Sequence, residues 1–252
     1  MNYKYYLKSD IGTTHAVNQD SAFAQVKGTS MGKAFLGVVC DGMGGMSSGD
    51  YASGVVSGAF MRWFRSFSPR SSGDDIQGWL FAEWDELISW CNNELFGLGV
   101  RRNAAMGTTL SALLIVGGEY YIAQLGDSRV YYRGCGSPVL LTMDHSYVMD
   151  MVQKGMMTEN EAAASKQRNI LTKCIGCADH ITADHYTGRV SQGDIFLLST
   201  DGFHSGTDID RISLVMSGAG NRDLKGCILS AIDERKKGGE KDNITALAVQ
   251  LV

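Results

Sequence analysis

The sequence lacks the features that mark membrane proteins, secreted proteins and nucleic-acid-binding proteins. No apolar run approaches the roughly 20 residues that a transmembrane helix needs. The opening stretch MNYKYYLKSD has no apolar region of the kind found in secretory signals. The formal net charge of −4 leaves no excess of lysine and arginine for binding nucleic acid or an anionic membrane surface. We therefore expect a cytoplasmic protein that binds neither.

Cysteine is sparse and forms no evident framework. The six cysteines lie at positions 40, 91, 135, 174, 177 and 227. Only Cys174 and Cys177 have a recognisable spacing, C-x-x-C, which would suit half of a zinc site or a redox pair. No second C-x-x-C and no paired histidine motif accompanies it. We therefore predict two free thiols in a strand or loop, as in a protein of a reducing compartment.

Short apolar runs with the composition of β-strands recur along the chain. They cover residues 3–8, 21–26, 34–40, 108–116, 119–125, 129–134, 194–200 and 243–252. Gly117 and Gly118 link two of these runs, and a two-residue glycine link is typical of a tight hairpin. We therefore expect neighbouring strands to run antiparallel.

Two longer segments carry apolar residues at helical spacing. The first stripe comprises Tyr51, Val55, Ala59, Trp63 and Phe67, and the second Ile76, Leu80, Trp84, Leu87, Cys91 and Leu95. A capping box from Thr158 to Glu161 predicts a short helix, and another is expected at 222–237. Hairpin strands with separate helices, undivided by a linker or repeat, predict a single α+β domain over residues 1–252.

Aspartates recur where the predicted strands meet loops, and a rigid sheet can aim short side chains there at one point. Those next to a strand end are Asp41, Asp127, Asp201 and Asp242, and Asp20 lies just before another strand. One such aspartate alone would be a turn residue or a helix cap. However, segments 9–26, 34–61 and 190–210 contain neither lysine nor arginine. If the carboxylates converge, a cation from outside the chain must neutralise them.

The predicted donor set consists of oxygen atoms, which favours Mg²⁺ or Mn²⁺ over zinc or copper. Two such ions bridged by one carboxylate would turn water into hydroxide near neutral pH. They would also hold a phosphoryl group for in-line attack.

Residues 45–49, GMSSG, also match the G-x-S-x-G nucleophile elbow of serine hydrolases. In that elbow the serine follows its strand directly, whereas six residues separate Cys40 from Ser47. The elbow also requires parallel strands, which the glycine hairpin contradicts. We interpret Ser47 and Ser48 as residues that lead into a helix. The same stretch has neither the G-K-[ST] of a P-loop nor a complete G-x-G-x-x-G.

Several short motifs follow one another in a fixed order. They are VNQDS (17–21), VCDGMGG (39–45), GTTLSALL (107–114), LGDSRVYYR (125–133), LTMDHSYV (141–148), NILTKCIG (169–176), LLSTDGF (197–203) and DNIT (242–245). In this order they resemble the metal-dependent Ser/Thr protein phosphatases of the 2C type (the PPM family), in a bacterial single-domain form. The resemblance implies a four-layer α/β/β/α sandwich of two antiparallel sheets flanked by helices, with a metal site between the sheets at one end.

By the same resemblance, two Mn²⁺ or Mg²⁺ ions would be held by four of these residues. Asp41 would bridge both metals, and the Gly42 carbonyl would bind one of them. Asp201 and Asp242 would complete the shell of the other metal.

Asp20, preceded by Gln19, would hold metal-bound water and complete the catalytic set with Asp41, Asp201 and Asp242. Asp127 would help to bind a third, looser metal. The segment at about 142–170 would be a mobile flap beside the site. A metal-bridging hydroxide would then attack phosphorus directly, without a phosphoenzyme.

Two positions depart from the family pattern. His15 stands where the family commonly has an arginine that binds the substrate phosphate. Arginine is always charged and binds phosphate through two nitrogens. His15 is therefore either a weaker, pH-dependent phosphate ligand or a surface residue whose role another group fills. His204 lies in a stretch that is usually more apolar. Close to Asp201 it could contact metal or water, but we expect a loop histidine without a defined partner.

The sequence thus predicts a monomeric phosphatase that removes phosphate from phosphoserine or phosphothreonine in proteins, the targets of a Ser/Thr kinase. The alternative is a catalytically weak, phosphatase-like module that binds phosphoproteins. Retention of Asp41, Asp201 and Asp242 favours the enzyme, whereas His15 favours the alternative.

Overall fold

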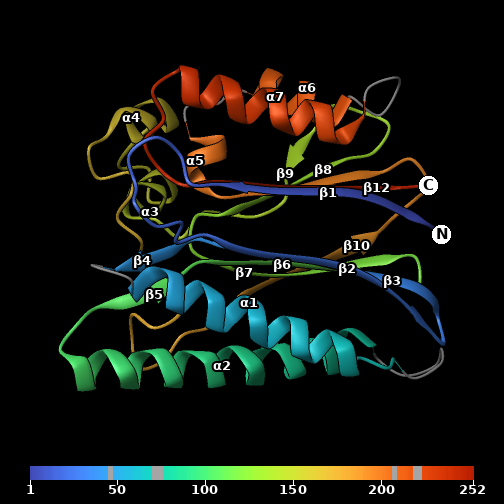
Figure 1. Ribbon diagram of the computed structural model, residues 1–252, viewed down its shortest axis with the longest axis horizontal. Coiled ribbons are helices and arrows are strands. Elements are labelled where there is room, and N and C mark those ends of the chain that lie inside the picture. The colour runs from blue at the N-terminus through green and yellow to red at the C-terminus, as the bar shows by residue number, and fades with distance from the viewer. Residues whose placement is uncertain (45–47, 70–75, 206–208, 218–222) are drawn as a thin grey trace.

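The strands form two five-stranded antiparallel sheets that lie face to face (Figure 1). This computed structural model describes residues 1–44, 48–69, 76–205, 209–217 and 223–252. The first sheet has the order β1 (Tyr3–Asp10), β12 (Ile244–Leu251), β11 (Ile195–Ser199), β8 (Arg129–Arg133) and β9 (Val139–Leu140). The second has the order β10 (Asp184–Arg189), β7 (Glu119–Leu125), β6 (Leu110–Val116), β3 (Gly32–Cys40) and β2 (Ser21–Thr29). The short strands β4 (Gly42–Gly44) and β5 (Met106–Thr108) pair separately.

Helices cover the outer face of each sheet. On the second sheet lie α1 (Ser48–Ser66) and α2 (Ile76–Arg102), and on the first lie α6 (Ile209–Ser217) and α7 (Leu224–Lys237) (Figure 1). Three short helices gather at one end of the sheets, namely α3 (Tyr147–Gln153), α4 (Glu159–Ala164) and α5 (Asp201–His204). The predicted four-layer sandwich is confirmed. In the described part of the chain, no helix combines the length and apolar character needed to cross a membrane.

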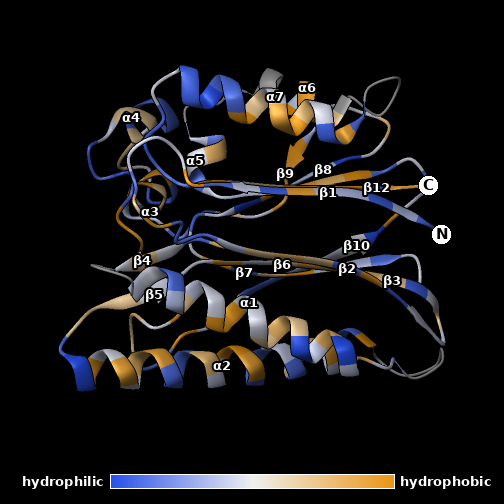
Figure 2. Ribbon diagram, in the orientation of Figure 1, coloured by the Kyte–Doolittle hydropathy of each residue, from blue (hydrophilic) through white to orange (hydrophobic). Residues whose placement is uncertain are grey.

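The apolar core has three layers, one at each interface of the sandwich. Phe60 and Trp84 pack edge to face between the second sheet and its helices. Phe196 is fully buried between the sheets, and Ile228 is fully buried between the first sheet and α7. Figure 2 shows apolar and polar stretches alternating along α2 and α7, as expected for helices that bury one side only. This core packs the two sheets together and so sets the positions of the strand ends.

The predicted helical stripes are partly correct. In α2, Leu80, Trp84 and Leu95 are fully or almost fully buried, as expected. In α1, Tyr51 is 50% exposed, contrary to the prediction, and the buried face includes Phe60 instead. The prediction spaced the residues four apart, whereas the helical period of 3.6 residues turns such a row away from the core.

Local turn signals were reliable. Gly117 and Gly118 both have positive φ and join β6 to β7 in the predicted hairpin. The capping box at Thr158 is present, and α7 lies within the range expected for it. The strand β10 was missed, because its sequence DHYTGR is polar and lies at a sheet edge where no residue is fully buried.

Candidate functional site

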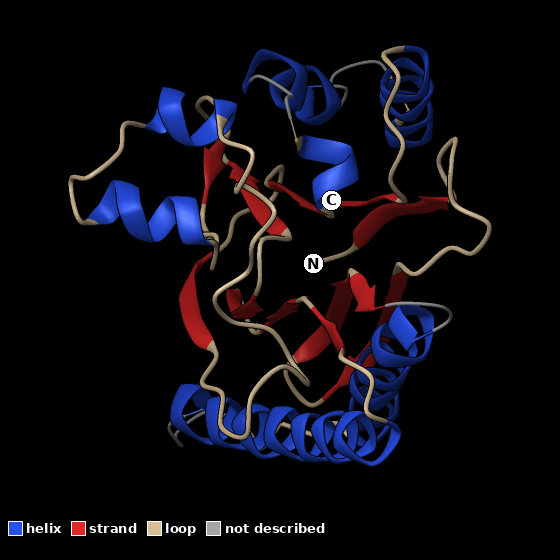
Figure 3. Cartoon of the chain, turned by 90° about the vertical axis from the view of Figure 1, so that its left-hand side faces the viewer, coloured by secondary structure: helices blue, strands red, loops and turns tan. Residues whose placement is uncertain are grey.

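The predicted aspartates lie at the end of the sandwich where α3, α4 and α5 gather, which Figure 3 shows facing the viewer. Asp41 links β3 to β4, and Asp127 follows β7. Asp201 is the first residue of α5, directly after β11. Asp242 and Asp20 precede β12 and β2. Five segments that are distant in the sequence thus bring carboxylates to one end of the two sheets.

These carboxylates are close enough to influence one another's ionisation. Burial raises the pKa of Asp41 well above its usual range, and the charges of Asp20 and Asp201 raise it further. Burial raises the pKa of Asp20 to about 7 and that of Asp127 to about 8, with the charge of Asp201 adding to both. For Asp201, burial and then the charge of Asp242 raise the pKa to about 6. Each shift means that the site, as it stands, disfavours negative charge.

Two of the buried carboxylate oxygens have no hydrogen-bond partner. The Thr200 and Thr245 hydroxyls donate to Oδ2 of Asp20 at 3.0 and 2.6 Å. Its Oδ1 atom and Oδ1 of Asp201 are buried and unpartnered within the described structure. A buried polar atom without a partner costs free energy and calls for a ligand or water. These oxygens are therefore free to meet a cation or a water molecule.

The donor set fits a hard divalent ion. All five candidate side chains offer carboxylate oxygen, which Mg²⁺ and Mn²⁺ prefer. Among the residues that the structure describes, no three acidic, histidine or cysteine side chains already surround a point as a finished ligand set. The donor atoms therefore suit Mg²⁺ or Mn²⁺, although the carboxylates alone do not form a complete coordination shell.

The backbone around Asp41 is fixed by hydrogen bonds from β5 and the residue after it. The Asp41 amide donates to the Thr109 hydroxyl at 2.8 Å, and its carbonyl accepts the Thr108 hydroxyl at 2.9 Å. Gly42 must lack a side chain, because a Cβ atom there would lie 2.1 Å from the carbonyl oxygen of Gly49 in α1. The glycine thus allows β4 to pack closely against the helix.

His15 lies at the rim of the acidic cluster. Its Nε2 atom is 3.4 Å from Oδ1 of Asp242, and both side chains are 45% exposed. The residue that replaces the family's arginine therefore contacts one of the candidate metal ligands and is open to solvent.

The prediction for His204 was wrong. It is a buried residue at the end of α5, and its Nδ1 atom lies 3.0 Å from the Ser199 hydroxyl. Burial, followed by the charges of Arg129 and Arg235, lowers the pKa of His204 far below its usual value. The histidine is thus a neutral packing residue held by a defined contact.

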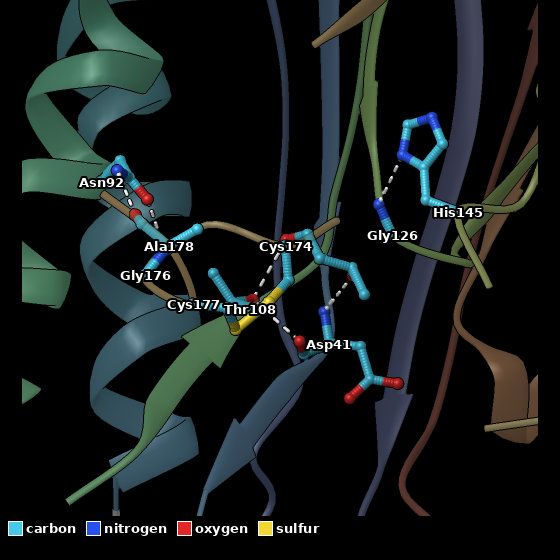
Figure 4. The surroundings of a disulfide bond; sticks show 10 residues. Asp41, Asn92, Thr108, Gly126, His145, Cys174, Gly176, Cys177 and Ala178 are labelled. Carbon is cyan, nitrogen blue, oxygen red and sulfur yellow. Dashed lines mark hydrogen bonds between the residues drawn. A yellow bond between two sulfur atoms is a disulfide. The ribbon is translucent and has the colours of Figure 1, made fainter. Parts of the chain in front are cut away.

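The prediction of two free thiols at 174 and 177 was also wrong. Cys174 and Cys177 form a disulfide beside the turn that carries Asp41 (Figure 4). The C-x-x-C spacing permits this bond, but spacing alone does not distinguish it from a thiol pair or a metal site.

Two residues near Asp127 were missed by the sequence reasoning. Arg129 donates through Nε and Nη2 to the two oxygens of Asp144, at 2.9 and 2.7 Å. The Asp144 charge helps to raise the pKa of Asp127, after burial and Asp201. The signal was present, because Arg129 belongs to the GDSR motif and Asp144 to the MDHS motif.

The segment at 142–170 begins and ends on paired backbone. Ser146 and Leu171 form an antiparallel bridge, and the Tyr147 amide donates to the Ile170 carbonyl at 2.8 Å. The segment contains α3 and α4 and lies at the same end of the molecule as the aspartates.

The rival serine elbow lies mostly outside the described residues. Ser47 falls in the range 45–47, which the structure does not describe. Ser48 is the first residue of α1, as the helix interpretation predicted. The sheets are antiparallel, whereas the elbow requires a parallel sheet.

Comparisons with known proteins agree on one family. A family model described as protein phosphatase 2C matches residues 12–219. The chain is 30% identical over 254 residues to protein phosphatase PhpP of Streptococcus pneumoniae, with 97% of this chain and 96% of that protein covered. A serine/threonine phosphatase of S. agalactiae matches with a TM-score of 0.85 at 30% identity, covering 100% of both chains.

A further solved structure carries metal. It is the catalytic domain of the serine/threonine protein phosphatase PstP in complex with two manganese ions. It matches with a TM-score of 0.81 at 25% identity, covering 99% of this chain and 98% of that one.

Proposed function

Because this chain belongs to the protein phosphatase 2C family and is a Ser/Thr protein phosphatase, we propose that it hydrolyses phosphoserine and phosphothreonine with two divalent ions and without a phosphoenzyme. The observation that carries the proposal is the cluster of buried and partly buried carboxylates, in which the pKa values of Asp20, Asp41 and Asp201 are raised by burial and by neighbouring charges. Such a cluster is stable in its charged form only when cations neutralise it. The manganese-bound relative supports the choice of ion.

In the proposed site, Asp41, the Gly42 carbonyl, Asp201 and Asp242 hold two ions, Mn²⁺ or Mg²⁺, and Asp127 helps to hold a third. When bound, the ions supply a water acidic enough to act as a nucleophile, and they offset the charge of the phosphoryl group. The backbone hydrogen bonds of Asp41 fix the turn from which its carboxylate projects.

Asp20 is the residue proposed to orient the attacking water. The Thr200 and Thr245 hydroxyls hold the Oδ2 atom of Asp20, and this fixes the orientation of the whole carboxylate. Its Oδ1 atom is buried and has no hydrogen-bond partner in the described structure. A water that donates a hydrogen bond to this oxygen would be oriented for in-line attack on phosphorus; the bond from phosphorus to the serine or threonine oxygen would break, and that oxygen would take up the proton lost by the water and leave as the hydroxyl. No side chain of the enzyme forms a bond to phosphorus in this scheme.

The remaining proposals concern the substrate and its surroundings. His15, exposed beside Asp242, would contact the substrate phosphate. The segment at 142–170 would be a mobile flap that touches the peptide around the phosphorylated residue. We propose a single cytoplasmic domain that acts as a monomer on the targets of a Ser/Thr kinase.

Hydrolysis of p-nitrophenyl phosphate and of a phosphothreonine peptide tests the proposal. Activity should require Mn²⁺ or Mg²⁺, disappear with EDTA and fall by at least about 100-fold in Asp201→Asn. Asp233→Asn is the matched control, because Asp233 is exposed on α7 and its loss should leave activity unchanged. Activity that survives both EDTA and Asp201→Asn would refute the metal mechanism. A folded protein that binds phosphopeptide but is inactive with every metal would favour the phosphoprotein-binding module.

A further inference from the structure

The two cysteines of the disulfide, Cys174 and Cys177, differ in their exposure to solvent. Cys174 is buried, with 4% of its surface exposed, whereas Cys177 is exposed. Both residues line a pocket of about 610 Å³, whose wall also includes Met43 and His180. A small thiol can therefore reach Cys177 from solvent, while Cys174 is the protected partner. The other four cysteines are free, and of these only Cys135 is exposed.

The loop that carries the disulfide is held on two sides. The Thr108 amide donates to the Ile175 carbonyl at 3.0 Å, and the Ile175 amide donates back to the Thr108 carbonyl at 2.9 Å. On the other side, the Gly176 amide donates to Oδ1 of the buried Asn92 at 2.8 Å, and Nδ2 of Asn92 donates to the Ala178 carbonyl at 3.0 Å. Both ends of the short disulfide loop are therefore tied to neighbouring elements (Figure 4).

The disulfide also packs directly on β5. A Cβ atom at Gly107 would lie 2.6 Å from Sγ of Cys177 and 3.4 Å from Sγ of Cys174, so the sulfur atoms rest against the strand backbone. The next residue, Thr108, donates its hydroxyl hydrogen to the Asp41 carbonyl at 2.9 Å. In Figure 4 the backbone of Asp41 faces Thr108, and its carboxylate points away from the disulfide. A continuous chain of contacts thus joins the sulfur pair to the turn that carries Asp41.

We propose that Cys174 and Cys177 are a reversible thiol–disulfide exchange site whose oxidised form braces the Asp41 turn through β5. The effect on catalysis rests on the proposed phosphatase mechanism, whereas the exchange chemistry and the bracing of β5 do not. A C-x-x-C disulfide with one exposed and one buried cysteine favours attack of a thiolate at the exposed residue, because exchange rates depend on access.

The exchange partner is a small dithiol or its disulfide. In reduction, a thiolate of the dithiol attacks Sγ of Cys177, and the bond to Cys174 breaks and releases the Cys174 thiolate, which takes up a proton. The second thiol of the reagent then attacks the mixed disulfide and releases Cys177 as a thiol. Two electrons and two protons pass to the protein, and the dithiol becomes a cyclic disulfide. Oxidation uses a small disulfide such as oxidised glutathione: the Cys177 thiolate attacks it and releases one glutathione, and the Cys174 thiolate then attacks the mixed disulfide and releases the second, so that two electrons and two protons pass from the protein to two glutathione molecules.

Thiol counting tests the exchange site. The protein is equilibrated with oxidised glutathione or with dithiothreitol, denatured, alkylated and weighed by mass spectrometry. With oxidised glutathione we expect four cysteines outside the disulfide, each alkylated except that the exposed Cys135 can instead carry one glutathione, and with dithiothreitol we expect all six alkylated. Six alkylated cysteines under both conditions, or four under both, would overturn the proposal.

Amide hydrogen exchange on the metal-free protein tests the bracing without reference to catalysis. We expect dithiothreitol to speed exchange by about fivefold or more at Thr108, Ile175 and Gly176, with a smaller rise at Asp41 and Thr109, since loss of the cross-link loosens the loop. Exchange that is unchanged throughout 106–109 and 174–176 would overturn the link to Asp41. Comparing the two redox states of the unaltered protein makes this test independent of whether a variant folds.

Activity then tests the consequence. The reduced protein should have a severalfold lower phosphatase rate at limiting Mn²⁺, and oxidised glutathione should restore it. Cys135→Ser should respond in the same way, whereas the double variant Cys174→Ser, Cys177→Ser should not respond at all. Equal rates in the two redox states would overturn the effect on catalysis. An inactive protein that still shows the thiol and exchange changes would contradict the proposed function and leave the exchange site standing.

Discussion

Removal of divalent ions should make the thermal stability of this protein fall as the pH rises. Burial, with the charges of Asp201 and Asp242, raises the pKa of Asp20 from 3.8 to about 7 in the folded protein. The unfolded chain therefore loses this proton at a lower pH than the folded chain does. A group with a raised acidic pKa stabilises the fold least above its folded pKa, so stability is lost between about pH 4 and pH 8.

The size of the effect follows from this pKa. One pKa unit corresponds to about 1.4 kcal/mol, so Asp20 alone accounts for at most about 3 kcal/mol between pH 5 and pH 8. Water that enters the site and movement of the carboxylates reduce this, and we expect about 1 to 2 kcal/mol. For a chain of this length, that corresponds to a decrease in Tm of roughly 4 °C. Asp127, whose pKa burial raises to about 8, acts in the same direction.

Differential scanning calorimetry in EDTA at pH 5 and pH 8 measures this decrease. Added Mn²⁺ should raise Tm at both values and more at pH 8, because protons compete with the ion at pH 5. Asp20→Asn is the decisive variant, since its amide oxygen can still accept the Thr200 and Thr245 hydroxyls. In EDTA at pH 8 it should be more stable than the unaltered protein, with a smaller difference between the two pH values. A metal-free Tm that is constant or rises from pH 5 to pH 8 would refute the reasoning.

Three further predictions concern single residues. His15→Arg should lower KM for a phosphopeptide with little change in kcat, and an unchanged KM would exclude a role in phosphate binding. Gly42→Ala should lower Tm markedly, because its Cβ would lie 2.1 Å from a backbone oxygen, whereas Gly54→Ala, which meets nothing within 4 Å in α1, should be neutral or stabilising. Arg129→Lys should lower the free energy of unfolding by about 1 to 3 kcal/mol in urea titration, because lysine cannot bind both oxygens of Asp144, and an unchanged midpoint would contradict this.

The parts of the fold that the sequence predicted are those whose local pattern agrees with their tertiary environment. The glycine pair at 117 and 118 determines a hairpin by its backbone geometry alone. The strand β3 is buried over most of its length and therefore reads as an apolar run. The strand β10 is polar, and only its pairing with β7 makes it a strand, so nothing in its own sequence could reveal it.

The same distinction holds for the candidate site, where some residues could be located from the sequence and the environment of others could not. The aspartates could be located because each stands beside a strand, and strand ends are recognisable in a sequence. The environment of His204 could not, since its burial depends on the packing of α5 against distant segments. The bond between Cys174 and Cys177 was missed for a similar reason. The course of the loop at 174–178 is set by hydrogen bonds to Asn92 and Thr108, which are far away in the sequence.

The acidic cluster lowers the stability of the metal-free protein, and this cost indicates a functional role. Asp41 and Asp201 lie where burial and neighbouring charges oppose their ionisation, and Oδ1 of Asp201 lacks a hydrogen-bond partner within the described structure. A chain under selection for stability alone would replace such groups with neutral or apolar ones, which are often neutral or stabilising in buried positions. Their cost is offset by the rigid core of the two sheets and is removed when cations bind. Residues that lower stability in this way concentrate at functional sites. We therefore expect the chemistry at the loops of this end of the sandwich and not on the larger apolar surfaces of the helices.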